Sequence, residues 1–454
     1  MKGGLVKVFR LRPGETGLVL TMGFLLFSNS MAQQIAKIVS VSGFLSEGGV
    51  NQVLILWVID MLLILLIAGL QSLVVDRFDR ITLMRWSVFG LAIVYLCLRL
   101  MFILQIYGRI IYAVMFILVD LQWMFFPLIF WILANDVFDM AQAKRLFPLI
   151  ASWSFVGRIL GIGFAAVSPS LFRQLGVKAE EVLDFNVFIY LLAYIVMAIG
   201  LRHAKVRKTI LKQATMRETL AEGWGFIREV PSFRYLTIAI AAVSVTLTMN
   251  EFRFLVVSDA VFDTRDSYQQ FYSFYQLGLA LASFAVQSLL TSRIIEKISL
   301  KSTFIIQPAA ALVGAVWMII QIGIIGAVGC MVLVKLIQKT IDESARKAFQ
   351  SIVPEERRGR VSIFMDSYLP AGATILGSLI AGVIVFVGLQ LGISNYFYAY
   401  MTVAVLAALL ATWAAFRMRV VYDTSLFNWR LKRRQRAASV LDTAIMKALS
   451  DEED

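Results

Sequence analysis

Ionisable side chains lie inside long apolar stretches of this chain, where they could bind a charged ligand or pair with one another. Such groups are costly at membrane depth and usually face a cavity or a partner. Basic residues outnumber acidic ones, and lysine and arginine suit phosphate and carboxylate groups. The interior charge therefore favours an anionic solute, and ion pairing between helices is the alternative. The basic residues are Lys37, Arg99, Arg158, Arg253 and Lys335, and the acidic ones are Asp60, Asp120, Glu251 and Asp366.

Two of the basic residues have distinctive surroundings. Arg99 lies a few residues from the end of its apolar stretch, so its side chain could snorkel to the membrane surface. Arg158 lies among Gly157, Gly161 and Gly163. Glycines let a second helix approach closely, so we expect a partner or a ligand beside Arg158.

Other kinds of chemistry find little support in the sequence. One histidine and two cysteines argue against a zinc or haem site. The chain has no G-x-x-x-x-G-K-[ST] loop to bind nucleotide phosphates for hydrolysis, and no nucleophile is paired with a general base. We therefore expect neither an enzyme nor a bound cofactor.

Composition places the elements that carry these residues in a membrane. Hydrophobic residues make up 59% of the 454-residue chain and charged residues 16%, whereas soluble domains contain about 25% charged residues. A helix of about 20 apolar residues crosses a bilayer. Twelve such stretches predict an all-α, major-facilitator-like membrane protein of two six-helix halves. They are 16–38, 51–75, 82–105, 109–134, 146–168, 184–203, 235–257, 267–291, 303–322, 324–340, 362–388 and 395–416.

The distribution of basic residues supports this topology. Of the 43 lysines and arginines, 34 lie in alternate segments that the topology places inside, and four lie in outer loops. Because basic residues collect on the cytoplasmic side, we expect a multi-pass protein of a bacterial inner membrane with both termini in the cytoplasm. The net charge of +13 then reflects inner loops that face anionic lipid, and it requires no nucleic acid partner.

A long polar segment near the middle divides the chain into four predicted parts. Residues 1–203 form an N-terminal half, 204–234 a cytoplasmic amphipathic linker, 235–416 a C-terminal half and 417–454 a basic cytoplasmic tail. The linker helix could lie on the inner membrane surface or pack on inner loops of the protein. The tail could lie on the membrane, bind a soluble partner or remain in solvent.

A short repeat occurs at equivalent points of the two halves. Residues 79–83 read DRITL and residues 296–300 read EKISL, so the residue types agree position by position. Two parallel halves suit alternating access about a central site. The segment 76–80, DRFDR, also resembles the signature loop of the major facilitator superfamily, although Ser72 and Asp79 stand where that motif has glycines.

Further segments resemble nucleotide transporters of the ATP/ADP translocase type, which are distant relatives of the major facilitators. The fourth span and the loop after it have the Phe-Trp, Ala-Asn and Ala-Lys-Arg progression of that family. The basic segment 339–359 resembles its loop before the eleventh span. The matching residues are Phe27, Asn29 and Lys37, then Phe130–Trp131, Ala134–Asn135 and Ala143–Lys144–Arg145, and then Asn250–Glu251 and Arg253.

The resemblance implies exchange or carriage of ATP, ADP or another phosphorylated anion by alternating access. The chain departs from the family at Ile38, where aspartate is usual, and Asp120 lies only near the place of a family glutamate. The basic residue before the eleventh span is either Arg346 or Lys347. The substrate-binding residues that we expect are Lys37, Asp120, Arg158, Glu251, Arg253, Lys335, Arg346 and Lys347.

Two other functions remain open at this point. The chain could be a non-transporting membrane scaffold or sensor of the major-facilitator type, whose interior charges pair with one another. It could also be a facilitator of a hydrophobic or lipid solute, which would have a lateral opening between helices. If a nucleotide does bind, Phe252, Phe254 and Tyr275 could stack on its base.

The topology makes a direct prediction. Tags at both ends of the chain should be protected from a protease added outside, because the basic segments stay in the cytoplasm. Sites engineered into 169–183 and 258–266 should be cleaved, as both are predicted outer loops. Cleavage of a C-terminal tag in sealed cells would rule out an even number of spans.

Overall fold

The computed structural model of the chain describes residues 15–75, 79–105, 107–176, 181–202, 216–350, 353 and 355–451. The signature-loop residues 76–78 and the linker residues 204–215 lie outside the described part, as do the side chains of Lys144 and of tail residues 425–451. Within the described ranges the chain forms helices and the short turns between them, and it has no strand.

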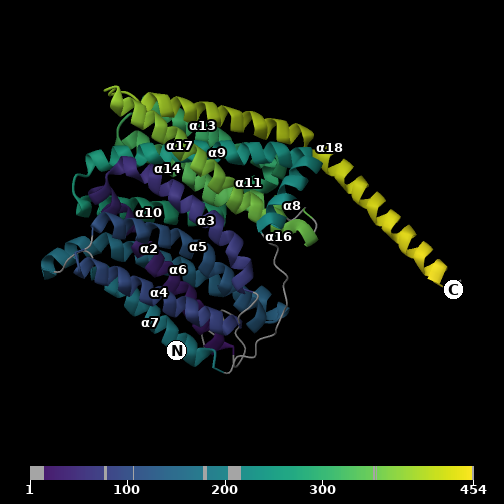
Figure 1. The fold of residues 1–454 in the computed structure, drawn as a ribbon, viewed down its shortest axis with the longest axis horizontal. Helices are drawn as coiled ribbons and strands as arrows, with labels where there is room; N and C mark the ends of the chain where they lie inside the picture. The colour runs from purple at the N-terminus through teal and green to yellow at the C-terminus, as the bar shows by residue number, and fades with distance from the viewer. Residues whose placement is uncertain are drawn as a thin grey trace. The chain divides into compact units, whose positions relative to one another are not determined.

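Long apolar helices dominate the fold (Figure 1). Eleven of the described helices are long and apolar enough to cross a membrane, and there are twelve if α10 and α11, which meet at 51°, form one bent span. This confirms the predicted all-α fold with about twelve spans. Up to residue 200 the helices are α2 (Thr16–Gly48), the short helix η1 (Val50–Gln52), α3 (Val53–Val75), α4 (Arg80–Ile103), α5 (Gly108–Val137), α6 (Met140–Leu175) and α7 (Val182–Gly200).

The later helices include two short π-helical segments, η3 and η4. A π-helical turn adds a residue to the turn and is frequent at functional sites. The helices from residue 216 onward are α8 (Met216–Glu229), α9 (Pro231–Val261), α10 (Arg265–Leu289), α11 (Thr291–Ile298), α12 (Leu300–Thr303), α13 (Ile306–Ile320), α14 (Ile324–Ile337), η3 (Gln338–Asp342), α15 (Glu343–Gln350), α16 (Glu355–Ile363), η4 (Phe364–Tyr368), α17 (Leu369–Gln390) and α18 (Phe397–Asp451).

The chain forms two compact units. Unit 1 consists of Met1–Thr215 and Phe252–Ala282, and unit 2 consists of Met216–Glu251 and Ser283–Asp454. Helices α9 and α10 therefore each contribute residues to both units.

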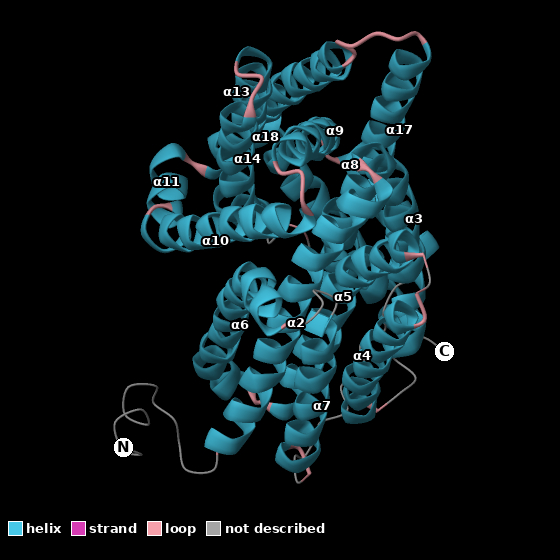
Figure 2. Cartoon of the chain, turned by 90° about the vertical axis from the view of Figure 1, so that its left-hand side faces the viewer, coloured by secondary structure: helices cyan, strands magenta, loops and turns pink. Residues whose placement is uncertain are grey.

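Helix α2 is the centre of unit 1. It packs against α5, α6 and α7, while α4 packs against α5 and α7 (Figure 2). Glycines of α6 allow the closest approach: a Cβ atom on Gly161 would lie 2.6 Å from the carbonyl oxygen of Met31, and one on Gly157 would collide with that of Phe27. The predicted glycine-mediated approach of a second helix therefore occurs, and the second helix is α2.

In unit 2, α13 packs against α14 and α18, and the linker helix α8 packs against α16 and η4. Gly223 of α8 lies directly against the ring of Phe364, and Ile227 is buried. Trp224 points outward, with 54% of its surface exposed. The described linker helix thus packs on other segments of the protein through one face and leaves Trp224 exposed on another.

The last span and the tail form one helix. Helix α18 runs for 55 residues from Phe397 to Asp451, and its apolar part ends near Thr424. Figure 1 shows it in yellow, continuing without interruption to the C-terminal end.

The packing of α2 on α6 predicts a sharp difference between neighbouring glycines. Gly157→Ala should lower the apparent unfolding temperature of the detergent-purified protein, because forcing a methyl group against backbone costs about 1–3 kcal/mol. Gly163→Ala is the matched control, since nothing lies within 4 Å of its would-be Cβ atom. Equal unfolding temperatures for the two variants would contradict this packing.

Candidate functional site

The eight predicted site residues lie on six helices. In unit 1 the residues are Lys37 on α2, Asp120 on α5, Arg158 on α6 and Arg253 on α9, and in unit 2 they are Glu251 on α9, Lys335 on α14, and Arg346 and Lys347 on α15.

Glu251 and Lys335 form an ion pair in unit 2. The Lys335 ammonium donates to Oε2 of Glu251 over 2.8 Å, across 84 residues of sequence. About a fifth of the Lys335 side chain and a third of the Glu251 side chain are exposed. A pair in such partly buried surroundings is held more strongly than one at a free surface, yet it can still be reached by a competing anion.

Arg346 lies between two carboxylates, and both come from π-helical segments. Its Nε atom is 3.0 Å from Asp342 at the end of η3, and its Nη1 atom is 3.2 Å from Asp366 within η4. The amide of Gln350 donates to the second oxygen of Asp366 over 2.8 Å. Each π-helical segment thus supplies one carboxylate to the same guanidinium group, which fixes its orientation.

The alternative residue, Lys347, has different surroundings. It pairs with Glu343 one turn earlier at 2.6 Å, and two thirds of its side chain is exposed. Surface pairs of this type contribute about 0.3–0.5 kcal/mol. Of the two basic residues that the sequence left open, Arg346 is the one held within a polar cluster.

A second charged cluster lies in unit 1. The carboxyl group of Asp60 on α3 faces that of Asp120 on α5, and the ammonium group of Lys37 acts on it electrostatically. Asp60 is fully buried, whereas Lys37 and Asp120 are half-buried. The structure therefore brings together two predicted site residues and adds a third, Asp60. Its position inside an apolar stretch was the available signal in the sequence.

A network of uncharged polar side chains joins α2 to α4, α5 and α7. Gln122 of α5 donates to Oδ1 of Asn29 over 2.9 Å and accepts from the hydroxyl of Tyr95 over 3.0 Å. The Tyr190 hydroxyl also donates to Asn29, over 3.1 Å, and all four side chains are buried. Asn29, which belongs to the family resemblance, is thus part of an inter-helix network that sequence reasoning did not predict.

The remaining arginines have contrasting positions. Arg253 is only 8% exposed, and Arg158 is half-buried, one residue after the tightly packed Gly157. Arg99 donates to the carboxylate of Asp184 over 3.1 Å and lies 3.6 Å from Glu181, so it forms ion pairs at the end of its span.

The aromatic side chains near Arg253 are packing residues in this structure. Phe252 and Phe254 are almost completely buried. The ring of Phe254 lies 5.0 Å from that of Tyr275 and 6.1 Å from that of Phe271. A nucleotide base could reach the rings of Phe252 and Phe254 only after the helices move, whereas Tyr275 is half-buried.

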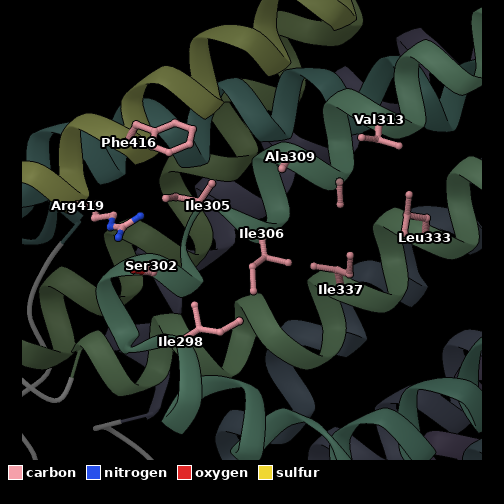
Figure 3. Close-up of a pocket in the computed structure, with 11 residues that line it drawn as sticks. Ile298, Ser302, Ile305, Ile306, Ala309, Val313, Leu333, Ile337, Phe416 and Arg419 are labelled. Atoms are coloured by element: carbon pink, nitrogen blue, oxygen red, sulfur yellow. The ribbon is translucent and has the colours of Figure 1, made fainter.

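An apolar pocket of about 560 Å³ lies in unit 2, among α11 to α14 and α18 (Figure 3). None of the predicted site residues lines it, and its polar contacts are limited to Ser302 and Arg419. The residues that line the pocket are Ile298, Ser302, Ile305, Ile306, Ala309, Ala310, Val313, Leu333, Ile337, Phe416 and Arg419.

Among the described residues, no group of three or more histidine, cysteine or acidic side chains could hold a metal ion.

The sequence matches a known protein family over most of its length. Residues 4–337 match the family described as TLC ATP/ADP transporter. The chain belongs to the TLC ATP/ADP transporter family. This confirms the family resemblance, and it makes the chain a multi-pass membrane transporter and not an enzyme. No curated protein matches the chain.

Solved transporter structures share the fold of this family member. A bacterial homologue of the iron transporter ferroportin in its inward-facing state aligns with a TM-score of 0.63 at 13% identity, over 90% of this chain and 100% of that chain. An auto-inhibited POT family peptide transporter aligns with a TM-score of 0.61 at 12% identity, over 88% and 96%. The nucleoside transporter NupG aligns with a TM-score of 0.59 at 13% identity, over 89% and 99%. At such identities the likeness establishes the major-facilitator-like fold alone.

Two of the ion pairs of unit 2, one more buried than the other, should differ in coupling free energy. In a double-mutant cycle with Glu251→Gln and Lys335→Met, the coupling free energy should be about 1–3 kcal/mol, because both partners are partly buried. The readout is denaturant unfolding of the purified transporter.

The matched control is the cycle of Glu343→Gln and Lys347→Met. That pair is more exposed, and it should couple by about 0.3–0.5 kcal/mol. If the inner pair couples no more strongly than this surface pair, then Glu251 and Lys335 do not form a stable pair in the folded protein.

Proposed function

We propose that this transporter exchanges ATP, ADP or another phosphorylated anion across a bacterial inner membrane, with both termini in the cytoplasm. The observation that carries the proposal is the family match over residues 4–337. The surplus of basic residues at membrane depth supports it, because arginine and lysine are the side chains that bind phosphate oxygens. The excess of basic residues in the predicted inner loops supports the orientation.

Lys37 and Arg253 are the residues to which we assign the phosphate groups. Lys37 is half-buried on the central helix α2, and Arg253 is almost fully buried on α9. Groups in such low-dielectric surroundings interact with a phosphate much more strongly than surface lysines do. Arg158 and Arg346 are further candidates of the same kind.

The Glu251–Lys335 pair supplies a way to link binding to motion. In the empty transporter Lys335 is compensated by Glu251 at 2.8 Å. A phosphate group with two negative charges competes for Lys335 and releases it from Glu251. Because a ligand shifts a conformational equilibrium only by its different affinities for the two states, exchange of this partner lets substrate binding favour a different arrangement of α9 and α14.

The test is counterflow in liposomes that contain the purified protein and unlabelled ADP. Labelled ATP added outside should accumulate inside. Lys37→Ala and Arg253→Ala should each reduce the rate about tenfold or more, since each removes a charge-assisted hydrogen bond. Lys297→Ala is the matched control, because Lys297 is an exposed lysine of α11, and it should exchange like the wild type.

The other possible results separate the alternatives. Exchange of inorganic phosphate or a sugar phosphate without exchange of nucleotides would replace the substrate and keep the anion transporter. Wild-type rates in both Lys37→Ala and Arg253→Ala would reject the assigned phosphate site. Folded wild-type protein that moves no anion would favour the scaffold or sensor, and transport of an apolar solute would direct attention to the pocket in Figure 3.

A further inference from the structure

The pocket of unit 2 changes in polarity along its length. Ser302 and Arg419 lie toward one end of it, and Val313 and Leu333 lie toward the other (Figure 3). Every other lining residue is apolar. The apolar part follows α13 from Ile306 to Val313, which is about 10 Å of helix because each residue rises about 1.5 Å. The pocket therefore has a short polar end and a long apolar part.

The polar end of the pocket lies near the ends of two candidate spans. Ser302 lies two residues after the start of one span, and Arg419 lies five residues before the end of another. The ion pair of Lys301 with Asp423 joins α12 to α18 at the same level. A membrane surface therefore falls beside Ser302 and Arg419, and the apolar part of the pocket runs from there toward the hydrocarbon.

The guanidinium group of Arg419 is available to an anion. Its side chain is exposed, and it forms no ion pair or hydrogen bond with any residue that the structure describes. The other cations nearby are engaged: Lys301 pairs with Asp423, and Arg417 lies over the ring of Trp413, 5.9 Å from its centre. Arginine binds phosphate oxygens through several N–H groups at once, so a phosphate at this end of the pocket would find donors.

A molecule that fits the whole pocket has to combine an anionic head with an apolar chain. Free phosphate would use Arg419 and leave the apolar part unfilled, and a neutral apolar solute would leave the guanidinium group without a partner. An anionic phospholipid satisfies both parts, and basic pockets between helices at a membrane surface are known to bind such headgroups. None of the residues that we assign to the transported substrate lines the pocket.

We propose that this pocket binds one anionic phospholipid, with an acyl chain among α13, α14 and α18 and its phosphate at Arg419 and Ser302. Under the proposed orientation of the protein, the lipid belongs to the cytoplasmic leaflet. Because it binds the folded form of unit 2, the lipid stabilises that unit. The lipid site stands or falls independently of nucleotide exchange.

The headgroup is tested by native mass spectrometry of the delipidated full-length protein with phosphatidylglycerol or phosphatidylcholine of identical chains. The wild type should bind one phosphatidylglycerol about fivefold more tightly than phosphatidylcholine, as expected for one basic residue at a membrane surface. Arg419→Gln should bind the two lipids equally. Arg417→Gln is the matched control, because it removes the same charge from the same helix outside the pocket, and it should keep the preference.

The acyl chain is tested by filling the apolar part of the pocket. Ala309→Phe should lose the tightly bound lipid of either kind, whereas Val316→Phe should retain it, because Val316 is an exposed residue of α13 that does not line the pocket. The deacylated headgroup, glycerophosphoglycerol, should not displace the lipid.

Three results would overturn the lipid site. Equal loss of the preference in Arg417→Gln and Arg419→Gln would mean that the headgroup responds to surface charge alone. Unchanged lipid binding by Ala309→Phe would place the acyl chain elsewhere. A lipid-free wild-type dimer that Ala309→Phe converts to a monomer would assign the pocket to a second copy of the chain.

Discussion

The free-energy penalty for charge in a low-dielectric interior organises this molecule. Charged groups from different helices reduce this penalty by interacting with one another. Lys335 pairs with Glu251, and Lys37 interacts with the acidic cluster of Asp60 and Asp120. Because unpaired ionised groups are so costly there, side chains that we assign to the substrate also hold helices together in the structure. Under the proposed function an anion replaces an existing partner, and this replacement links binding to a change in packing.

The position of Lys37 depends on the packing of α2. Its neighbour α6 packs through glycines against the backbone of α2. Gln122 of α5 and Tyr190 of α7 donate to Asn29, and Tyr95 of α4 donates to Gln122. Helix α2 can therefore neither slide along its axis nor rotate about it by much. Either movement would break the buried hydrogen bonds and separate the small residues from the backbone that they contact. The lysine eight residues beyond Asn29 is placed accordingly.

The π-helical segments of unit 2 play a comparable role for Arg346. An extra residue in a helical turn changes the direction in which the following side chains point. Asp342 closes one such segment and Asp366 lies inside the other, and both reach the same guanidinium group. Asp342 lies four residues before Arg346, a spacing at which helical side chains are neighbours, and Asp366 reaches the same guanidinium group from the second segment.

Much of the architecture was available from the sequence, because lipid makes the local pattern decisive. Apolar stretches of span length must form helices, since no water satisfies their backbone groups, and the motifs around Lys37, Phe130–Trp131 and Glu251 indicated the family. The sequence did not reveal which charges meet. Glu251 lies 84 residues from Lys335 and Asp60 lies 60 residues from Asp120, and their encounter depends on how each helix is rotated about its axis. Only the tertiary packing of side chains decides that rotation, and it also decided that Arg346 is enclosed while Lys347 faces solvent.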